Sequence, residues 1–183
     1  MRLLPAVLAL SLSLVSVTAF AQNLAITGSP LPDQPYTFIY PDVMVTSGEL
    51  GGPQTINHPG LPLQCVLTVV PVEDTTWTAE GALADLDPNT VAAGWSESFP
   101  GFTLGTSLVT RYQSSPALQY EGTSTGGDQG PITLVHTETV EAGNGYTLDC
   151  FYATEMAAEA RPVVDAIIAN FSTKLDAQPV VTR

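Results

Sequence analysis

Two cysteines, Cys65 and Cys150, constrain this chain most, because each lies in a stretch with the alternation of a β-strand. The apolar residues in phase with the cysteines are Leu63, Leu67, Val69, Tyr146, Leu148 and Tyr152. Two such strands, side by side with the same face inward, bring the two sulfur atoms together beneath a core. We therefore predict a disulfide between Cys65 and Cys150. The alternative, a catalytic thiol, needs a nearby base and partial exposure, and neither is indicated.

The first residues have the pattern of an export signal. Arg2 precedes an apolar stretch that runs to about Val17, and Ala19-Phe20-Ala21 has the small-x-small pattern of a cleavage site. We predict a signal peptide at 1–21, a periplasmic or secreted mature protein, and no membrane anchor after cleavage. In such an oxidising compartment an even pair of cysteines is most simply a disulfide.

Alternation and turn residues predict an extended leader at 22–35, a single α+β domain at 36–174 and a frayed tail at 175–183. Stretches with strand character are 36–40, 63–72, 108–113, 117–124, 132–140 and 146–152. The second of these is apolar on both faces, which predicts a central strand with helices on both sides. We expect loop with one short strand at 47–62 and a turn at 101–105.

Capping residues predict a helix in two pieces between Ala79 and Trp95. Thr78 is a suitable N-cap, and Asp87-Pro88 combines a second N-cap with a proline in the first helical position. A last helix is expected from near Arg161, with Pro162 as its first residue, and residues 153–160 are a candidate helical turn that leads into it. These elements predict a central, mostly antiparallel sheet flanked by helices.

The charge balance limits the classes of partner. The chain has 18 acidic and 5 basic residues, a formal net charge of −13. Such a surface repels phosphate backbones and anionic lipid, so we predict no nucleic-acid binding. It tolerates cationic partners, although acidity also keeps an exported protein soluble without any partner.

Candidate catalytic residues have simpler explanations. Gly122–Gly126 matches the G-x-S-x-G motif with Ser124 as nucleophile, but the glycine- and proline-containing residues 127–131 that follow cannot start the required helix. We interpret His136 as a core residue bonded to backbone and His58 as a loop residue. Glu121 and Glu138 are candidates for a carboxylate pair, yet both are expected to face water. We predict no catalytic residue set, and whether the protein is an enzyme stays open, with a non-enzyme favoured.

Metal and cofactor sites have little support. Asp85–Asn89 resembles the opening of a calcium loop, but Thr90 and Ser96 stand where that loop needs glycine and glutamate. We predict no metal and no cofactor. The aromatic side chains that are candidates to line a cleft, although such residues are usually core, are Trp77, Trp95, Tyr112 and Tyr120.

The order of elements resembles the Mog1/PsbP-like fold group. The residues that carry the resemblance are Tyr36, Tyr40-Pro41, Gly145–Leu148, Val164, Ile167-Ile168 and Phe171-Ser172. The resemblance implies an α/β/α sandwich with a central antiparallel sheet. The group has no common catalytic residue set, and its members mostly bind or assist other proteins.

These observations predict an exported, non-enzymatic accessory module that binds a protein partner. One alternative is a periplasmic protein that binds a small ligand between the sheet and the two-piece helix. The other is a hydrolase that uses Ser124 or acidic residues.

Overall fold

The computed structural model describes residues 23–125, 130–175 and 177–180, so the predicted signal peptide lies outside the described residues. The strands are β1 (Leu24–Gly28), β2 (Thr37–Pro41), β3 (Val45–Gly48), β4 (Gln54–Asn57), β5 (Leu63–Pro71), β6 (Thr103–Arg111), β7 (Pro116–Ser124), β8 (Ile132–Glu141) and β9 (Asn144–Ala153). Seven of them form one sheet in the order β3-β4-β5-β9-β8-β7-β6, and β1 pairs with β2 in a separate sheet. All neighbouring strands run antiparallel, which confirms the predicted α+β architecture.

The two-piece helix is present, as α1 (Ala79–Asp85) and α2 (Pro88–Ser96). The Thr78 hydroxyl accepts a hydrogen bond from the Gly81 amide, and the Asp87 carboxylate accepts one from the Asn89 amide. Both caps satisfy amides that have no partner inside the helix. The predicted break is therefore confirmed.

The last helix begins earlier than predicted. A 3₁₀ turn (η2, Thr154–Met156) leads into α3 (Ala157–Asn170), and Pro162 lies inside this helix instead of starting it. Residues 157–160 are Ala-Ala-Glu-Ala, all strong helix formers, so the helix extends past the proline towards the N-terminus. Proline has no backbone N–H, so Pro162 removes one intrahelical hydrogen bond, close to the N-terminal end of α3.

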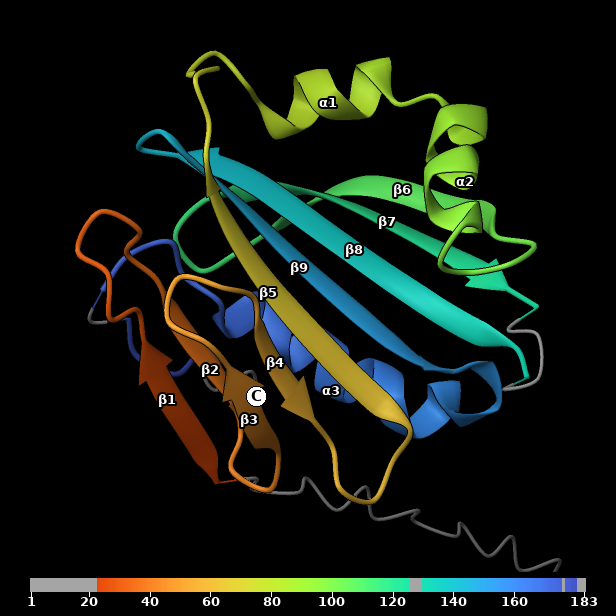
Figure 1. Cartoon of the computed structure of the whole chain (residues 1–183), viewed down its shortest axis with the longest axis horizontal. Coiled ribbons are helices and arrows are strands. Elements are labelled where there is room, and N and C mark those ends of the chain that lie inside the picture. The colour runs from red at the N-terminus through yellow and green to blue at the C-terminus, as the bar shows by residue number, and fades with distance from the viewer. Residues whose placement is uncertain (1–22, 126–129, 176, 181–183) are drawn as a thin grey trace, which may run out of the picture.

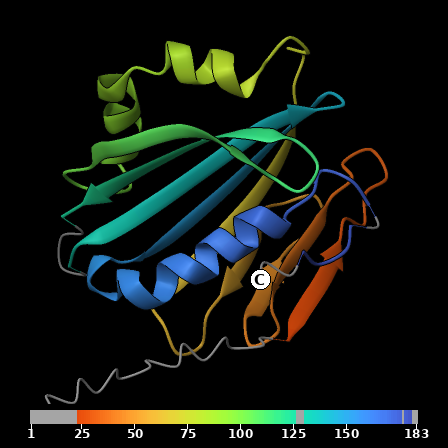
Figure 2. The same ribbon diagram turned by 180° about the vertical axis from the view of Figure 1, so that it is seen from behind.

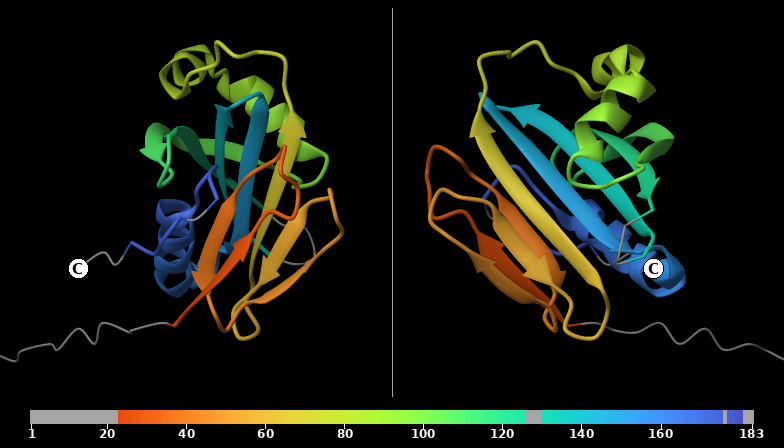
Figure 3. Two further views of the ribbon diagram at one scale, coloured as in Figure 1. Left: turned by 90° about the vertical axis from the view of Figure 1, so that its left-hand side faces the viewer. Right: turned by 45° about the vertical axis from the view of Figure 1, so that its right-hand side comes forward.

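The helices lie on the two sides of the seven-stranded sheet. Figure 1 looks onto the side that carries α1 and α2, with α3 passing behind β5, β9 and β8. From the back, α3 crosses the sheet, and β1 and β2 lie next to it (Figure 2). α3 contacts β2, β8 and β9, whereas α1 contacts β6 and β7 and α2 contacts β6 (Figure 3).

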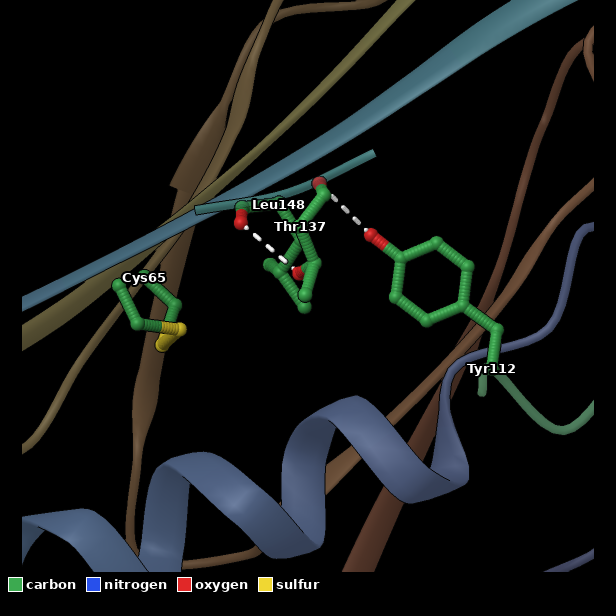
Figure 4. Close-up of a disulfide and its surroundings, with 5 residues drawn as sticks. Cys65, Tyr112, Thr137 and Leu148 are labelled. Carbon is green, nitrogen blue, oxygen red and sulfur yellow. Dashed lines mark hydrogen bonds between the residues drawn. A yellow bond between two sulfur atoms is a disulfide. The ribbon is translucent and has the colours of Figure 1, made fainter. Parts of the chain in front are cut away.

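The predicted disulfide is confirmed at the centre of the α3 side. Cys65 on β5 and Cys150 on β9 are directly opposite in the register, with Cα atoms 4.0 Å apart, and are bonded. Both are fully buried. Figure 4 shows the disulfide above α3, with Thr137 and Leu148 between it and Tyr112. The Tyr112 hydroxyl donates to the Thr137 carbonyl at 2.9 Å. The main core thus lies between the sheet, α3 and β2.

An aromatic cluster closes this core at the end of α3. Phe171 is fully buried, and its ring lies 4.6 Å from the ring of Tyr112 between centroids. The other rings around Phe171 are those of Tyr36, Phe38 and Tyr146. Backbone hydrogen bonds between Thr37 and Ser172 tie β2 to the segment after α3. Every residue of β2 is therefore buried.

Four segments can be compared in detail with the sequence-based expectations. The leader contains β1, which gains its partner only in the folded chain. β6 starts at Thr103, inside the predicted turn, with an irregular register between Leu104 and Thr106. The segment 47–62 contains β4 as its predicted short strand, and β3 reaches into it. In the predicted tail, the Val180 amide donates to the Asn170 side chain at 2.6 Å, so this part is hydrogen-bonded.

Candidate binding face of the sheet

The prediction that helices cover both sides of β5 is wrong. Side chains on β5 alternate between buried and half-buried positions as far as Thr68, and the buried set, with Cys65 and Leu67, faces α3. In the part of the chain that the structure describes, no helix lies over the other side of β5 and β9 (Figure 1). The sequence could not show this, because Val66 and Val70 make that side look like a second buried face.

We call this uncovered surface the open face and define it by six side chains. The register places Thr55, Val66 and Asp149 in one row across β4, β5 and β9. Thr68 and Thr147 form the next row, and Val70 follows beyond them. The six residues are Thr55, Val66, Thr68, Val70, Thr147 and Asp149. Five are half-buried, and Val70 is 47% exposed.

His136 marks the border between the open face and the part covered by α2. It lies opposite Asp149 on β9 and Tyr120 on β7. Its Nδ1 is 2.7 Å from the Asp149 carboxylate and its Nε2 is 3.5 Å from that of Glu138. The expected bond from His136 to backbone is therefore replaced by bonds to two carboxylates.

Electrostatics keep this histidine charged. Burial alone lowers the pKa of His136, but the hydrogen bonds and charges of Asp149 and Glu138 outweigh it and raise the pKa to about 9. The ring stacks on Tyr120 with centroids 4.3 Å apart and lies edge-on to Trp95. Burial raises the pKa of Tyr120, so its phenol stays neutral at physiological pH.

Aromatic side chains attach α2 to the sheet at this border. The Trp95 indole N–H donates to the Tyr120 hydroxyl at 2.8 Å. Phe99, just after α2, lies 5.7 Å from Phe151 of β9 between ring centroids. Gly122 of β7 lets Phe102 approach closely, because a Cβ at this position would overlap the Phe102 ring.

The geometry does not assemble a catalytic set from the candidate residues. Both nitrogens of His136 face carboxylates, so neither is open to take a proton from a substrate. The buried Ser124 ends β7 and donates to the Pro100 carbonyl at 2.6 Å, and Gly126 of its motif lies outside the described residues. His58 accepts a hydrogen bond from the Gly60 amide in the β4–β5 loop.

The two candidate glutamates cannot form a carboxylate pair. Glu121 lies opposite Val135, on the α3 side of the sheet, whereas Glu138 is on the same side as His136. Glu121 forms an ion pair with Arg161 of α3. Both were expected to face water, and each instead has a charged partner that shields it in part.

Metal-binding geometry is not found within residues 23–125, 130–175 and 177–180, where no cluster of three His, Cys, Asp or Glu is placed to hold an ion. The calcium-like segment serves as a helix cap. Hydrogen bonds from the Asn89 amide and the Thr90 hydroxyl hold the pKa of Asp87 below its usual value.

The four candidate aromatics lie in different places. Tyr112 is in the core on the α3 side, and Trp95 and Tyr120 meet at the border of the open face. Trp77 lines a cavity of about 160 Å³ between the start of α1 and strands β7 and β8. This small cavity is where the sequence predicted a ligand site. A larger one of about 320 Å³ lies elsewhere, where the β4–β5 loop meets the ends of β8 and β9.

Comparison with solved structures identifies the fold. Cyanobacterial PsbP (CyanoP) from Synechocystis sp. PCC 6803 aligns with a TM-score of 0.63 at 16% identity, covering 88% of this chain and 98% of CyanoP. LpqN, involved in cell envelope biogenesis of Mycobacterium tuberculosis, aligns with a TM-score of 0.54 at 14% identity over 81% and 90% of the two chains. The Ran-binding protein Mog1p of Saccharomyces cerevisiae aligns with a TM-score of 0.52 at 5% identity over 82% and 96%.

The chain therefore has the Mog1/PsbP-like fold, as its sequence resemblance predicted. No protein-family model and no curated protein sequence matches it. None of the helices in the described ranges combines the length and the apolar character needed to cross a bilayer. The disulfide is compatible with a periplasmic or secreted location.

Proposed function

We propose that this protein is an exported, non-enzymatic accessory module that binds a protein partner through the open face. The observation that carries the proposal is the half-covered sheet. The α3 side of β5 and β9 is buried from Leu63 to Leu67 and from Tyr146 to Tyr152, whereas the opposite side of the same strands has no helix above it in the described chain (Figure 1).

The composition of the open face suits a surface that binds another protein. Val66 and Val70 supply apolar area, and the threonines of the face supply hydroxyls on a flat strand surface. A sheet face left half-exposed, with apolar and polar side chains mixed, resembles the composition of non-obligate interfaces. The net charge of −13 favours a partner with basic residues around its contact surface.

The structural neighbours support the proposal only by analogy of fold. Mog1p is a Ran-binding protein and LpqN is involved in cell envelope biogenesis. Fold analogy does not transfer a partner, so the class of partner here comes from the charge and the open face of this chain.

Export is part of the same proposal. The predicted signal peptide and the buried disulfide together favour a periplasmic or secreted protein. The acidic charge argues against nucleic acid and anionic membranes as binding partners.

A matched pair of charge variants tests the proposal. Thr147→Arg places a long cation in the middle of the open face, and Thr106→Arg makes the same change on β6, at the far edge of the sheet. Tagged proteins exported by the native host are purified with their bound proteins, which are quantified by mass spectrometry. We expect Thr147→Arg to lower the yield of a specific partner at least tenfold and Thr106→Arg to leave it unchanged. Equal losses for both variants, or no specific partner with the wild type, would contradict the proposal.

A further inference from the structure

The cavity where the β4–β5 loop meets the ends of β8 and β9 lies next to the open face. Its volume is about 320 Å³, within the range of sites that take small groups. Its lining residues are Asn57, His58, Leu61, Pro62, Leu63, Gln64, Ile132, Phe151, Tyr152 and Ala153. Asn57, Gln64 and Phe151 form one row across β4, β5 and β9, adjacent to the row of Val66 and Asp149. The cavity therefore adjoins the open face.

The polar groups of the cavity form a matched pair. The Gln64 Nε2 donates to the Asn57 Oδ1 at 2.6 Å. Among the described residues, the Asn57 Nδ2 and the Gln64 Oε1 have no hydrogen-bond partner. Asn57 thus keeps a donor and Gln64 keeps an acceptor, the two kinds of group that a peptide group complements through its own carbonyl and N–H.

The lining has none of the side-chain types that are charged at neutral pH. No Asp, Glu, Lys or Arg lines this cavity, although the whole chain has 18 acidic residues. An ionised side chain placed here would lose water and gain no counter-charge, which is unfavourable. A saccharide fits poorly for a related reason. The lining has four side chains with polar groups, Asn57, His58, Gln64 and Tyr152, which are few for its many hydroxyls. Leucine, isoleucine, proline and phenylalanine side chains instead favour an apolar group.

We propose that this cavity takes an uncharged aliphatic or aromatic side chain from an internal segment of a protein partner, with the adjoining peptide group bonded to Asn57 and Gln64. The inference rests on the proposed function and deepens it. The cavity supplies the anchoring pocket for one side chain, while the open face contacts the surrounding surface. Interfaces commonly concentrate their binding energy in such a buried anchor.

Minimal peptide groups test the proposal directly. The oxidised mature protein, labelled with ¹⁵N, is titrated with N-acetyl-leucinamide, N-acetyl-phenylalaninamide, N-acetyl-aspartamide and methyl glucoside. We expect the first two to shift the side-chain amide signals of Asn57 and Gln64 and the backbone signals of Ile132 and Phe151. The dissociation constants should be on the order of millimolar, as suits such small ligands. The polar aspartamide and the glucoside should give no saturable shift.

Variants link the shifts to the amide pair. Gln64→Glu removes the donor to Asn57 and adds a charge to the cavity, so we expect at least fivefold weaker binding of N-acetyl-leucinamide. Gln34→Glu makes the same chemical change outside this cavity and should bind as the wild type does. The spectra show directly whether each variant is folded.

Three results would overturn the inference: shifts with methyl glucoside alone, no shift with any probe, or equal binding by Gln64→Glu and the wild type. These results are separable from a failure of the proposed function. If Thr147→Arg still abolishes partner capture while the cavity binds no peptide probe, the proposed binding through the open face is retained and the inference about the cavity is wrong.

Discussion

The two sides of the seven-stranded sheet are built differently. On one side α3 buries six of its residues, and the adjoining strands hold a disulfide and a cluster of aromatic rings. On the other side α1 and α2 together bury only Ala79, and half of the sheet has no helix above it in the described chain. Stability is thus concentrated on the α3 side. The α1–α2 side is left available for contacts with another protein.

The contacts on the α1–α2 side are few and mixed in character. Trp95 and Phe99 are half-buried and hold α2 against Tyr120 and Phe151, beside the charged His136. Elements with few buried apolar contacts open at low cost. The difference between the two sides can therefore be measured, and four predictions follow from it, in order of decreasing effect.

The disulfide should contribute most to the free energy of unfolding. Replacing both cysteines, as Cys65→Ala with Cys150→Ala, frees a loop of 85 positions in the unfolded chain. We expect a loss of about 4 kcal/mol, measured by urea unfolding against the wild type. A loss below about 1 kcal/mol would mean that the α3 side does not depend on this link.

A matched pair of phenylalanine truncations compares the two sides directly. Phe171→Ala removes a fully buried ring on the α3 side and should lower the free energy of unfolding by about 3–4 kcal/mol. Phe151→Ala removes a half-buried ring on the other side and should cost about 1–2 kcal/mol. Equal losses of unfolding free energy for the two variants, again measured by urea unfolding, would contradict the claim that stability is concentrated on the α3 side.

The His136 cluster should make stability depend on pH. The pKa of His136 is raised to about 9 in the folded protein, above its value in the unfolded chain, so the stabilisation is complete below about pH 6.5 and is lost as the pH rises through 9. We expect about 2–3 kcal/mol over this interval. His136→Gln should flatten that part of the profile of unfolding free energy against pH. A wild-type profile that is already flat between pH 6 and 9.5 would show that the carboxylates do not hold the proton.

The ion pair between Glu121 and Arg161 should matter least. The two side chains are 29% and 32% exposed, so water screens their attraction. Glu121→Gln should change the unfolding free energy by less than about 1 kcal/mol, and high salt should change it little further. A loss well above this value would show that the ion pair at the N-terminal half of α3 contributes substantially to the unfolding free energy, contrary to this prediction.

The sequence predicted the parts of this fold that depend on local pattern. The alternation around Cys65 and Cys150 was sufficient to predict the disulfide. The N-caps at Thr78 and Asp87 were sufficient to predict the break between α1 and α2. It could not predict β1, because five residues of weak alternation become a strand only when β2 lies beside them.

The open face was also beyond the reach of the sequence. Val66 and Val70 look like buried residues, and only the placement of α1 and α2 over β6 and β7 leaves them uncovered. The His136 cluster was missed for a similar reason. His136, Asp149 and Tyr120 are far apart in the chain and meet only through the register of β7, β8 and β9. The available signal was His136 followed by Glu138 two residues later, because alternation places these two side chains on the same face of the strand.

The most direct test of the account is a map of partner contacts in the native host. The photo-crosslinking residue p-benzoylphenylalanine is placed at Thr68 or Thr147 on the open face, and at Asp165 on the exposed side of α3, in the full-length exported protein. After irradiation, the account predicts one discrete crosslinked protein from the two open-face positions and none from Asp165. Crosslinks that form equally from α3, or that are absent from both open-face positions, would contradict the claim that the uncovered half of the sheet is the binding surface.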